Sequence, residues 1–122
     1  MAADKPTAQR WDELEADSPM ELLERRRVVG RRAMVAHITL RKGCKVPTHQ
    51  HESEQFVCVL SGRIRLGLGA EGSPERGEVI LEGGGVACVP SFLPHSAEAL
   101  EDTVVLDVFS PPSETTGIDR TP

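Results

Sequence analysis

The sequence predicts an all-β domain, either a barrel or a sandwich built from short strands. Apolar and polar residues alternate through much of the chain between residues 32 and 109, and eleven glycines and nine prolines divide it into short segments. Alternation with a period of two is typical of half-buried strands, and frequent turn residues keep each strand short. With 122 residues, the chain is long enough for one hydrophobic core and hence for one domain.

The N-terminal part of the chain is polar before the alternation begins. We interpret residues 1–18 as a flexible arm in which Trp11 is the one candidate anchor. Residues 20–29 fit either an amphipathic helical turn or a first strand, and we favour the extended form. The predicted barrel then spans residues 19–112.

Eight or nine strands with little helix follow from the pattern. The clearest segments are, by residue number, 20–29, 32–41, 49–60, 63–68, 79–82, 86–90, 95–99 and 103–109. A long hairpin loop is expected at 69–77 and a glycine turn at 83–85, because glycine permits the backbone angles that such turns require. Two prolines end the last strand, and residues 113–122 are predicted to form a flexible tail.

Composition excludes several classes of protein. The net charge of −5 and the pI near 5.3 argue against a nucleic-acid-binding protein. The three cysteines are too few and too irregularly spaced for a disulfide framework: we expect Cys58 and Cys88 to be small buried residues and place Cys44 in a turn. We find no apolar signal region and no stretch of membrane-spanning length, so we predict a cytoplasmic protein without a membrane partner.

The most informative stretch runs from His49 to Gln55. In an extended chain alternate side chains share one face, so His49, His51 and Gln55 would point the same way, together with Ser53. Two imidazoles and an amide oxygen suit a divalent transition metal ion. The run after them, residues 56–60, is apolar on both faces and is expected to continue into the core.

Two motifs resemble those of the cupin superfamily. The first has Gly43, His49, His51, Gln55 and Gly62 at the spacing Gly-x5-His-x-His-x3-Gln-x6-Gly. The second has Gly84, Pro90 and His95 at the spacing Gly-x5-Pro-x4-His. The resemblance covers roughly residues 20–112. It implies a double-stranded β-helix, a jelly-roll-like barrel, in which His95 joins the other two histidines on one metal ion.

One position departs from the usual cupin pattern. Where the family commonly has a glutamate ligand, this chain has Gln55, with Glu54 just before it. We therefore assign His49, His51, Gln55 and His95 as metal ligands and keep Glu54 as the alternative. A neutral amide leaves the full charge of the ion on the site, which favours an anionic substrate. The ligand set is compatible with Ni, Fe, Mn, Zn or Cu, so the metal is not identified.

Asp107 is the single acidic residue in the otherwise apolar run from residue 104 to residue 109. A carboxylate buried without a partner is costly. If its face lines the mouth of the barrel, Asp107 is a candidate general acid or base, and Phe109 on the same face is a candidate wall for a substrate ring. Alternatively, Asp107 lies on an exposed sheet face or pairs with an arginine of another strand.

The segment from residue 97 to residue 112 resembles the closing segment of the cupins that linearise 4,5-unsaturated uronates from pectin and alginate. In that group the Asp and Phe of Asp-x-Phe-Ser-Pro-Pro are functional residues, and here they correspond to Asp107 and Phe109. The group also has an arginine after the second proline, where this chain has Ser113. Because an arginine is a natural partner for a substrate carboxylate, this substitution raises the question of what replaces it.

The basic cluster of Arg25–Arg27 and Arg31–Arg32 follows an acidic arm, and we interpret it as a solvated strand edge or a subunit contact. We expect His37 to be exposed or at an interface. Edges of small barrels are often covered by a partner strand, so we predict a homodimer. Three functions fit the sequence: a metal-dependent sugar-acid enzyme, an oxygen-using metal cupin, and a small-molecule sensor without turnover.

Overall fold

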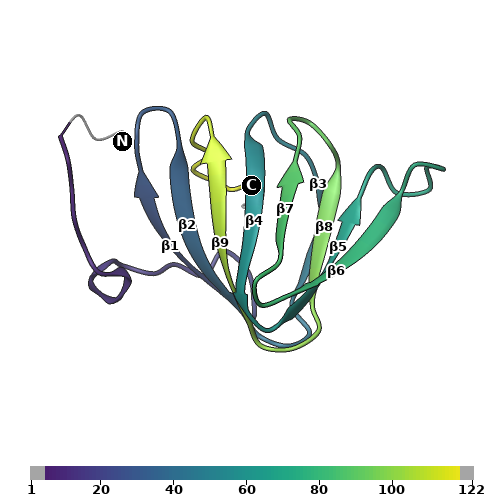
Figure 1. Ribbon diagram of the computed structural model, residues 1–122, viewed down its shortest axis with the longest axis horizontal. Coiled ribbons are helices and arrows are strands. Elements are labelled where there is room, and N and C mark those ends of the chain that lie inside the picture. The colour runs from purple at the N-terminus through teal and green to yellow at the C-terminus, as the bar shows by residue number, and fades with distance from the viewer. Residues whose placement is uncertain (1–4, 119–122) are drawn as a thin grey trace.

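The computed structural model describes residues 5–118, which form nine strands and one short 3-10 helix (Figure 1). The strands make two antiparallel sheets that face each other, which confirms the all-β prediction. The elements are η1 (Trp11–Glu13), β1 (Leu23–Val29), β2 (Met34–Leu40), β3 (Lys45–His49), β4 (Glu54–Ser61), β5 (Arg63–Leu68), β6 (Gly77–Glu82), β7 (Val86–Val89), β8 (His95–Ala99) and β9 (Thr103–Ser110).

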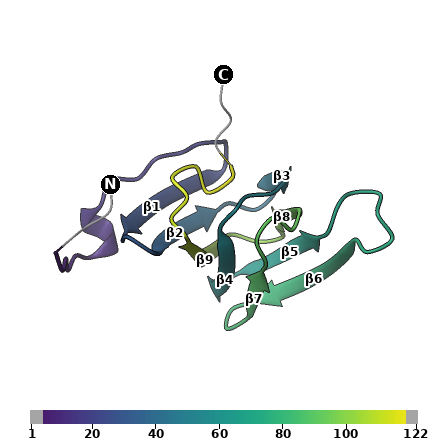
Figure 2. The same cartoon turned by 90° about the horizontal axis from the view of Figure 1, so that it is seen from above.

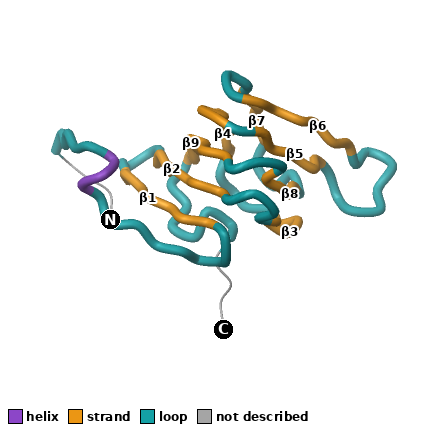
Figure 3. The backbone as a smooth tube through the Cα atoms, turned by 90° about the horizontal axis from the view of Figure 1, so that it is seen from below, coloured by secondary structure: helices purple, strands orange, loops and turns teal. Residues whose placement is uncertain are grey.

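The larger sheet has the strand order β1-β2-β9-β4-β7, and the smaller has the order β3-β8-β5-β6. Apart from the hairpins β1–β2 and β5–β6, consecutive strands such as β3 and β4 lie in opposite sheets (Figure 3). Gly62 makes the tight turn from β4 to β5 with a φ of 90°. A Cβ atom there would lie only 2.3 Å from the carbonyl oxygen of Asp102, so this turn requires glycine.

The core lies between the two sheets and follows from the alternation in the sequence. On β2 the inward residues are at most 3% exposed, and they alternate with half-buried residues on the outer face. The same pattern holds on β9, where Val105 and Phe109 are buried and Leu106 and Val108 are not. The buried core residues are Leu23, Met34, Ala36, Ile38, Leu40, Cys44, Val46, Val57, Val59, Ile64, Leu66, Val89, Ala99, Val105 and Phe109.

The predicted continuous strand from His49 to Leu60 is wrong. β3 ends at His49, β4 begins at Glu54, and the connection between them carries the chain from the smaller sheet to the larger one. Ser53 is buried in this connection, where its hydroxyl donates to the carbonyl oxygen of Pro111 at 2.5 Å. That hydrogen bond ties the connection to the end of β9, so residues 50–53 do not continue an extended strand.

Two burial predictions also fail. The outward residues of β4 do not enter a core, because Phe56 is 38% and Leu60 is 51% exposed. Cys88 is exposed and Cys58 is half-buried, whereas Cys44 in its turn is buried. The reason is the same for both: strands β4 and β7 present one face to the barrel interior and the other to the outside.

The segments before β1 and after β9 both contact the barrel. Trp11 packs on His37 of β2, with 5.3 Å between the ring centroids. Residues 113–118, which we call the strap, lie between β1 and β3 in the view of Figure 2, and Thr116 is only 2% exposed. The predicted arm and tail also include residues 1–4 and 119–122, which lie outside the described residues.

Arg25 differs from the expected solvated edge, because it is 1% exposed and contacts Asp17 and the strap. Its guanidinium group is held by a carboxylate and by hydrogen-bond acceptors, which is the condition under which an arginine is buried. No helix within residues 5–118 is long and apolar enough to cross a membrane.

Candidate metal centre

The three predicted histidines meet at one end of the barrel interior. His49 ends β3, His51 lies in the connection to β4, and His95 begins β8. β3 and β8 are paired so that His49 and His95 face each other, with 4.3 Å between ring centroids. The His51 ring lies 4.9 Å from that of His95 and 5.7 Å from that of His49. The smaller sheet therefore supplies two of the imidazoles, and the connection between β3 and β4 supplies the third.

Each imidazole is held by its Nδ1 atom. The acceptors are the backbone carbonyl oxygens of Pro47 for His49, Ser53 for His51 and Leu93 for His95, at 2.8, 2.9 and 2.7 Å. Because a carbonyl oxygen only accepts, Nδ1 carries the proton in each neutral ring, and the lone pair that can bind a metal is on Nε2. Histidines that bind a metal through one ring nitrogen commonly donate the N–H of the other to a backbone carbonyl oxygen in this way.

One ring nitrogen of each of the three histidines lies within 4.8 Å of the other two, so the cluster can hold one metal ion. The Nε2 atom of His95 is buried and has no hydrogen-bond partner among the described residues. Burial, together with the nearby His49 and His51, lowers the pKa of His95 to about 4, against the opposing effect of its hydrogen bond to Leu93. His95 is therefore neutral near pH 7, the form that binds metal.

Gln55 of β4 supplies an oxygen next to the histidines. Its Oε1 atom lies 3.0 Å from the Nε2 atom of His51. Since His51 Nε2 has a lone pair, two acceptors face each other at hydrogen-bond distance, which is unfavourable unless a cation lies between them. The donor set thus fits a divalent metal ion, and we propose His49, His51, Gln55 and His95 as its ligands.

The neighbouring acid, Glu54, lies on the other face of β4. Gln55 is 6% exposed and faces the interior, whereas Glu54 is exposed. The Sγ atom of Cys88 is 4.0 Å from a Glu54 carboxylate oxygen, on the outer side of the sheet. The strand alternation therefore presents the amide, and not the carboxylate, to the histidines.

Asp107 lies in the barrel interior and lines the same cavity as His49, Gln55 and His95. It is 7% exposed, and its neighbours in register are Ala36 and Val57, so it is neither on an exposed face nor opposite an arginine in the sheet. Burial raises the pKa of Asp107 to about 7, although a hydrogen bond from the Gln55 side chain opposes this rise.

Phe109 is fully buried two residues further along β9. Its ring meets that of His51 edge to face, with 5.6 Å between centroids and 66° between planes. The cavity lined by His49, Gln55, His95 and Asp107 has a volume of about 50 Å³, and neither Phe109 nor His51 lines it. A cavity of this size holds water-sized groups, because one water occupies about 30 Å³ of liquid.

Sequence reasoning missed the strap, which covers the histidines. A Cβ atom at Gly117 would lie 2.5 Å from Cδ2 of His49 and 2.6 Å from Cδ2 of His51, so the backbone rests directly on both rings. Gly117 also has a φ of 76°, which favours glycine. A Thr-Thr-Gly sequence after a proline pair signals only a turn, so contact with the metal centre was not evident before the fold was known.

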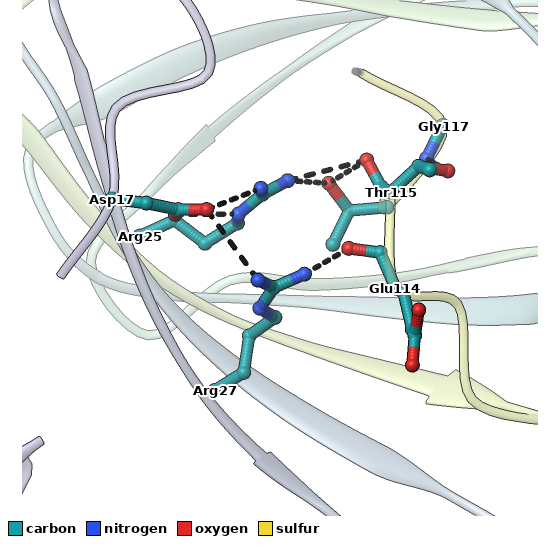
Figure 4. A network of polar contacts seen from close by, with 7 residues as sticks. Asp17, Arg25, Arg27, Glu114, Thr115 and Gly117 are labelled. Carbon is teal, nitrogen blue, oxygen red and sulfur yellow. Dashed lines mark hydrogen bonds and ion pairs between the residues drawn. The ribbon is translucent and has the colours of Figure 1, made fainter. Parts of the chain in front are cut away.

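Two arginines of β1 hold the strap in place (Figure 4). Arg25 donates from Nη1 to the carbonyl oxygen of Thr115 and to the hydroxyl of Thr116, at 3.2 and 3.0 Å. Arg27 donates to the carbonyl oxygen of Glu114. Both guanidinium groups also contact the carboxylate of Asp17, which is 2.7 Å from Arg25 and 3.4 Å from Arg27, and Arg25 keeps the pKa of Asp17 below its usual value.

We expect Gly117→Val to displace the strap, because the added side chain overlaps both imidazoles and the backbone angle is unfavourable for valine. In metal-loaded protein, EDTA should then remove the ion several-fold faster than in the wild type. Gly72→Val is the matched control, because Gly72 has a similar φ of 78° but no atom within 4 Å of its added Cβ. Equal removal rates for both variants would show that the strap does not cover the ion.

Residues 36–109, more than half of the chain, match the family described as "Cupin domain". The chain therefore belongs to the cupin family, which confirms the resemblance of its two motifs. No curated protein matches the chain.

Solved structures share the fold at low sequence identity. An RmlC-like cupin from Shewanella frigidimarina has a TM-score of 0.80 at 21% identity, over 90% of this chain and 95% of that one. KdgF from Halomonas sp. has a TM-score of 0.74 at 27% identity, over 84% and 93%. A variant of oxalate decarboxylase from Bacillus subtilis has a TM-score of 0.78 at 19% identity, over 95% of this chain but 34% of that protein. The similarities at 21% and 19% identity show the fold alone.

Proposed function

We propose that this cupin is a metal-dependent enzyme that opens and isomerises an anionic sugar acid of the 4,5-unsaturated uronate type. The observation that carries the proposal is the convergence of three histidine rings and the Gln55 amide beside the buried carboxyl group of Asp107. The match of Asp107 and Phe109 to the closing segment of the uronate-linearising cupins supports the choice of substrate. The similarity to KdgF at 27% identity, over most of both chains, agrees with it.

When bound, a divalent metal supplies a Lewis acid that polarises substrate oxygen atoms. Ring opening breaks the bond between the ring oxygen and the anomeric carbon. The anomeric hydroxyl loses a proton and the ene carbon gains one, so atoms balance and no oxidant is needed. We assign this proton transfer to Asp107, because its carboxyl group lines the same cavity as His49, Gln55 and His95.

The other residues position the substrate. The resemblance gives Phe109 a place against one face of the sugar ring, and in this structure its ring is fully buried against that of His51. A cavity of about 50 Å³ does not hold a monosaccharide, so the strap must move when the substrate enters. Its displacement would break the hydrogen bonds from Arg25 and Arg27 to the strap, and a substrate carboxylate could then join Asp17 as an acceptor for these guanidinium groups. The uronate-linearising cupins have an arginine at the position of Ser113. We propose that Arg25 and Arg27 bind the substrate carboxylate in its place.

The test is to incubate unsaturated galacturonate with protein loaded separately with Ni, Fe, Mn, Zn or Cu and to follow the absorbance of the ene-acid. We expect the absorbance to fall with at least one metal and to stay constant with EDTA-treated protein. No loss with any metal would contradict the proposal. Oxygen consumption in the same assay would instead indicate an oxygen-using cupin, and ligand binding without turnover would indicate a sensor.

A further inference from the structure

The strand β3 is irregular directly before its proposed metal ligand. Val46 has a partner on β8, and the next paired residue of β3 is His49, which stands opposite His95. Two residues of β3, Pro47 and Thr48, lie between these pairs, where β8 has only one residue. Two residues opposite one make a β-bulge. Because Pro47 has no backbone N–H group to donate to β8, the ladder of hydrogen bonds is interrupted at this point.

The bulge decides which way His49 points. In a regular strand alternate side chains share one face, so two residues three positions apart lie on opposite faces. Val46 and His49 are three positions apart, yet both line the cavity in the barrel interior, because the extra residue of the bulge reverses the alternation. The bulge also supplies the carbonyl oxygen of Pro47, to which His49 donates from Nδ1 at 2.8 Å. It therefore both turns the imidazole inward and orients its ring.

Side chains of the loop between β5 and β6, residues 69–76, contact the bulge. Arg76 donates from Nη1 to the hydroxyl of Thr48 at 3.3 Å and from Nη2 to the hydroxyl of Ser96 on β8 at 2.8 Å. The hydroxyl of Thr48 donates in turn to Oε1 of Glu71 at 2.6 Å. One guanidinium group therefore joins β3 to β8 at the bulge, and a carboxylate of the same loop completes the contact.

The strand β5 leaves room for this guanidinium group. A Cβ atom at Gly67 would lie 2.1 Å from Nη2 and 2.6 Å from Cζ of Arg76, so the group rests directly on the backbone of β5. Gly67 is itself the partner of Ser96 in the sheet. Arg76 also donates from Nη1 to the carbonyl oxygen of Gly69 at 2.7 Å, which ties the side chain to its own loop. The adjacent strands β3, β8 and β5 of the smaller sheet (Figure 1) thus all contact one side chain.

We propose that Arg76 is a positioning residue of the metal centre, which keeps the bulge in place and with it the imidazole of His49. Its two hydroxyl acceptors are direct neighbours of proposed ligands. Thr48 precedes His49 in β3. Ser96 follows His95 in β8. A guanidinium group suits this task because its donors form a rigid planar fork that bonds several acceptors at once. The proposal rests on the metal centre proposed above, but on neither the substrate nor the reaction.

The experiment titrates Co²⁺ into the chelator-treated full chain and follows the visible absorption of the bound ion. We expect Arg76→Met to raise the dissociation constant about tenfold, at the lower end of the effects of removing a residue that supports a metal ligand. Charge alone predicts the opposite sign, because removing a cationic side chain near the site should strengthen the binding of a cation. A weaker complex therefore reports positioning by Arg76.

Arg65→Met is the matched control, because it removes the same charge from the same sheet. Arg65 of β5 donates from Nη1 to Glu98 of β8 at 2.8 Å, further along β8 than Ser96 and away from the bulge. The dissociation constant of this variant should not exceed that of the wild type. A value for Arg76→Met at or below that of the wild type, an equal rise in both variants or a wild type that binds no Co²⁺ would overturn the proposal.

Gly67→Ala tests the contact with the arginine retained, in case Arg76→Met does not fold. The added Cβ would displace the flexible end of Arg76 and approach the hydroxyl oxygen of Ser96 at 2.5 Å, so the hydrogen bond between these two residues is lost. Gly77→Ala is its control, because Gly77 has no atom within 4 Å of an added Cβ. We expect weaker Co²⁺ binding in Gly67→Ala alone. Equal affinity of the two glycine variants would contradict the role of Arg76, and no outcome depends on turnover of the uronate.

Discussion

Replacing His51 by alanine is expected to remove most of the metal bound to this protein. His51 lies between the other ligands: its ring contacts those of His49 and His95, and its Nε2 atom faces Gln55 Oε1 at 3.0 Å. Loss of a residue that only hydrogen-bonds to a metal ligand commonly lowers metal affinity about 10- to 100-fold. Loss of a ligand itself should lower the affinity further. Elemental analysis should find the metal content of His51→Ala below roughly a tenth of the wild-type value.

Glu54→Ala is the control, because Glu54 is a neighbouring exposed acid on the outer face of β4. Its metal content should stay close to that of the wild type. Equal losses in both variants would mean that the ligand set is misassigned. Unchelated wild-type protein without bound metal would contradict the metal centre itself.

Asp107→Asn should abolish turnover while metal remains bound. The amide has nearly the shape of the carboxyl group but does not take up or release a proton at neutral pH, and loss of a general acid or base commonly costs about 10²- to 10⁴-fold in rate. The measurements are turnover of the unsaturated uronate and metal content on the same preparation. Unchanged turnover would assign the proton transfer to another group, and loss of metal would show that Asp107 acts mainly by orienting Gln55.

Asp107→Asn should also change how the stability of the metal-free protein depends on pH. The pKa of Asp107 is about 7 in the folded protein, whereas the unfolded chain has the ordinary value near 3.8. Between these values the folded state binds more protons, so stability falls as pH rises from about 4 to 7. Three pKa units correspond to about 4 kcal/mol at most. Thermal unfolding should therefore show Asp107→Asn gaining stability over the wild type above pH 7 and not at pH 4.

The sequence by itself predicted the fold class and the residues of the candidate site. Alternation along β2 and β9 depends only on neighbouring residues, and it put Asp107 and Phe109 on one face of a strand but left open whether that face was buried. The glycine, proline and histidine spacing identified the cupin family. Alternation also indicated that Gln55, and not Glu54, faces the histidines.

The tertiary structure alone decided how distant segments meet. The connection at residues 50–53 divides the expected long strand between two sheets, which sequence alternation did not reveal. Arg25 is buried because Asp17 and the strap surround it, and the strap residue Thr115 is 90 positions away in the chain. The cover over His49 and His51 likewise results from packing between segments distant in sequence, whereas a periodic pattern reports only on the local chain.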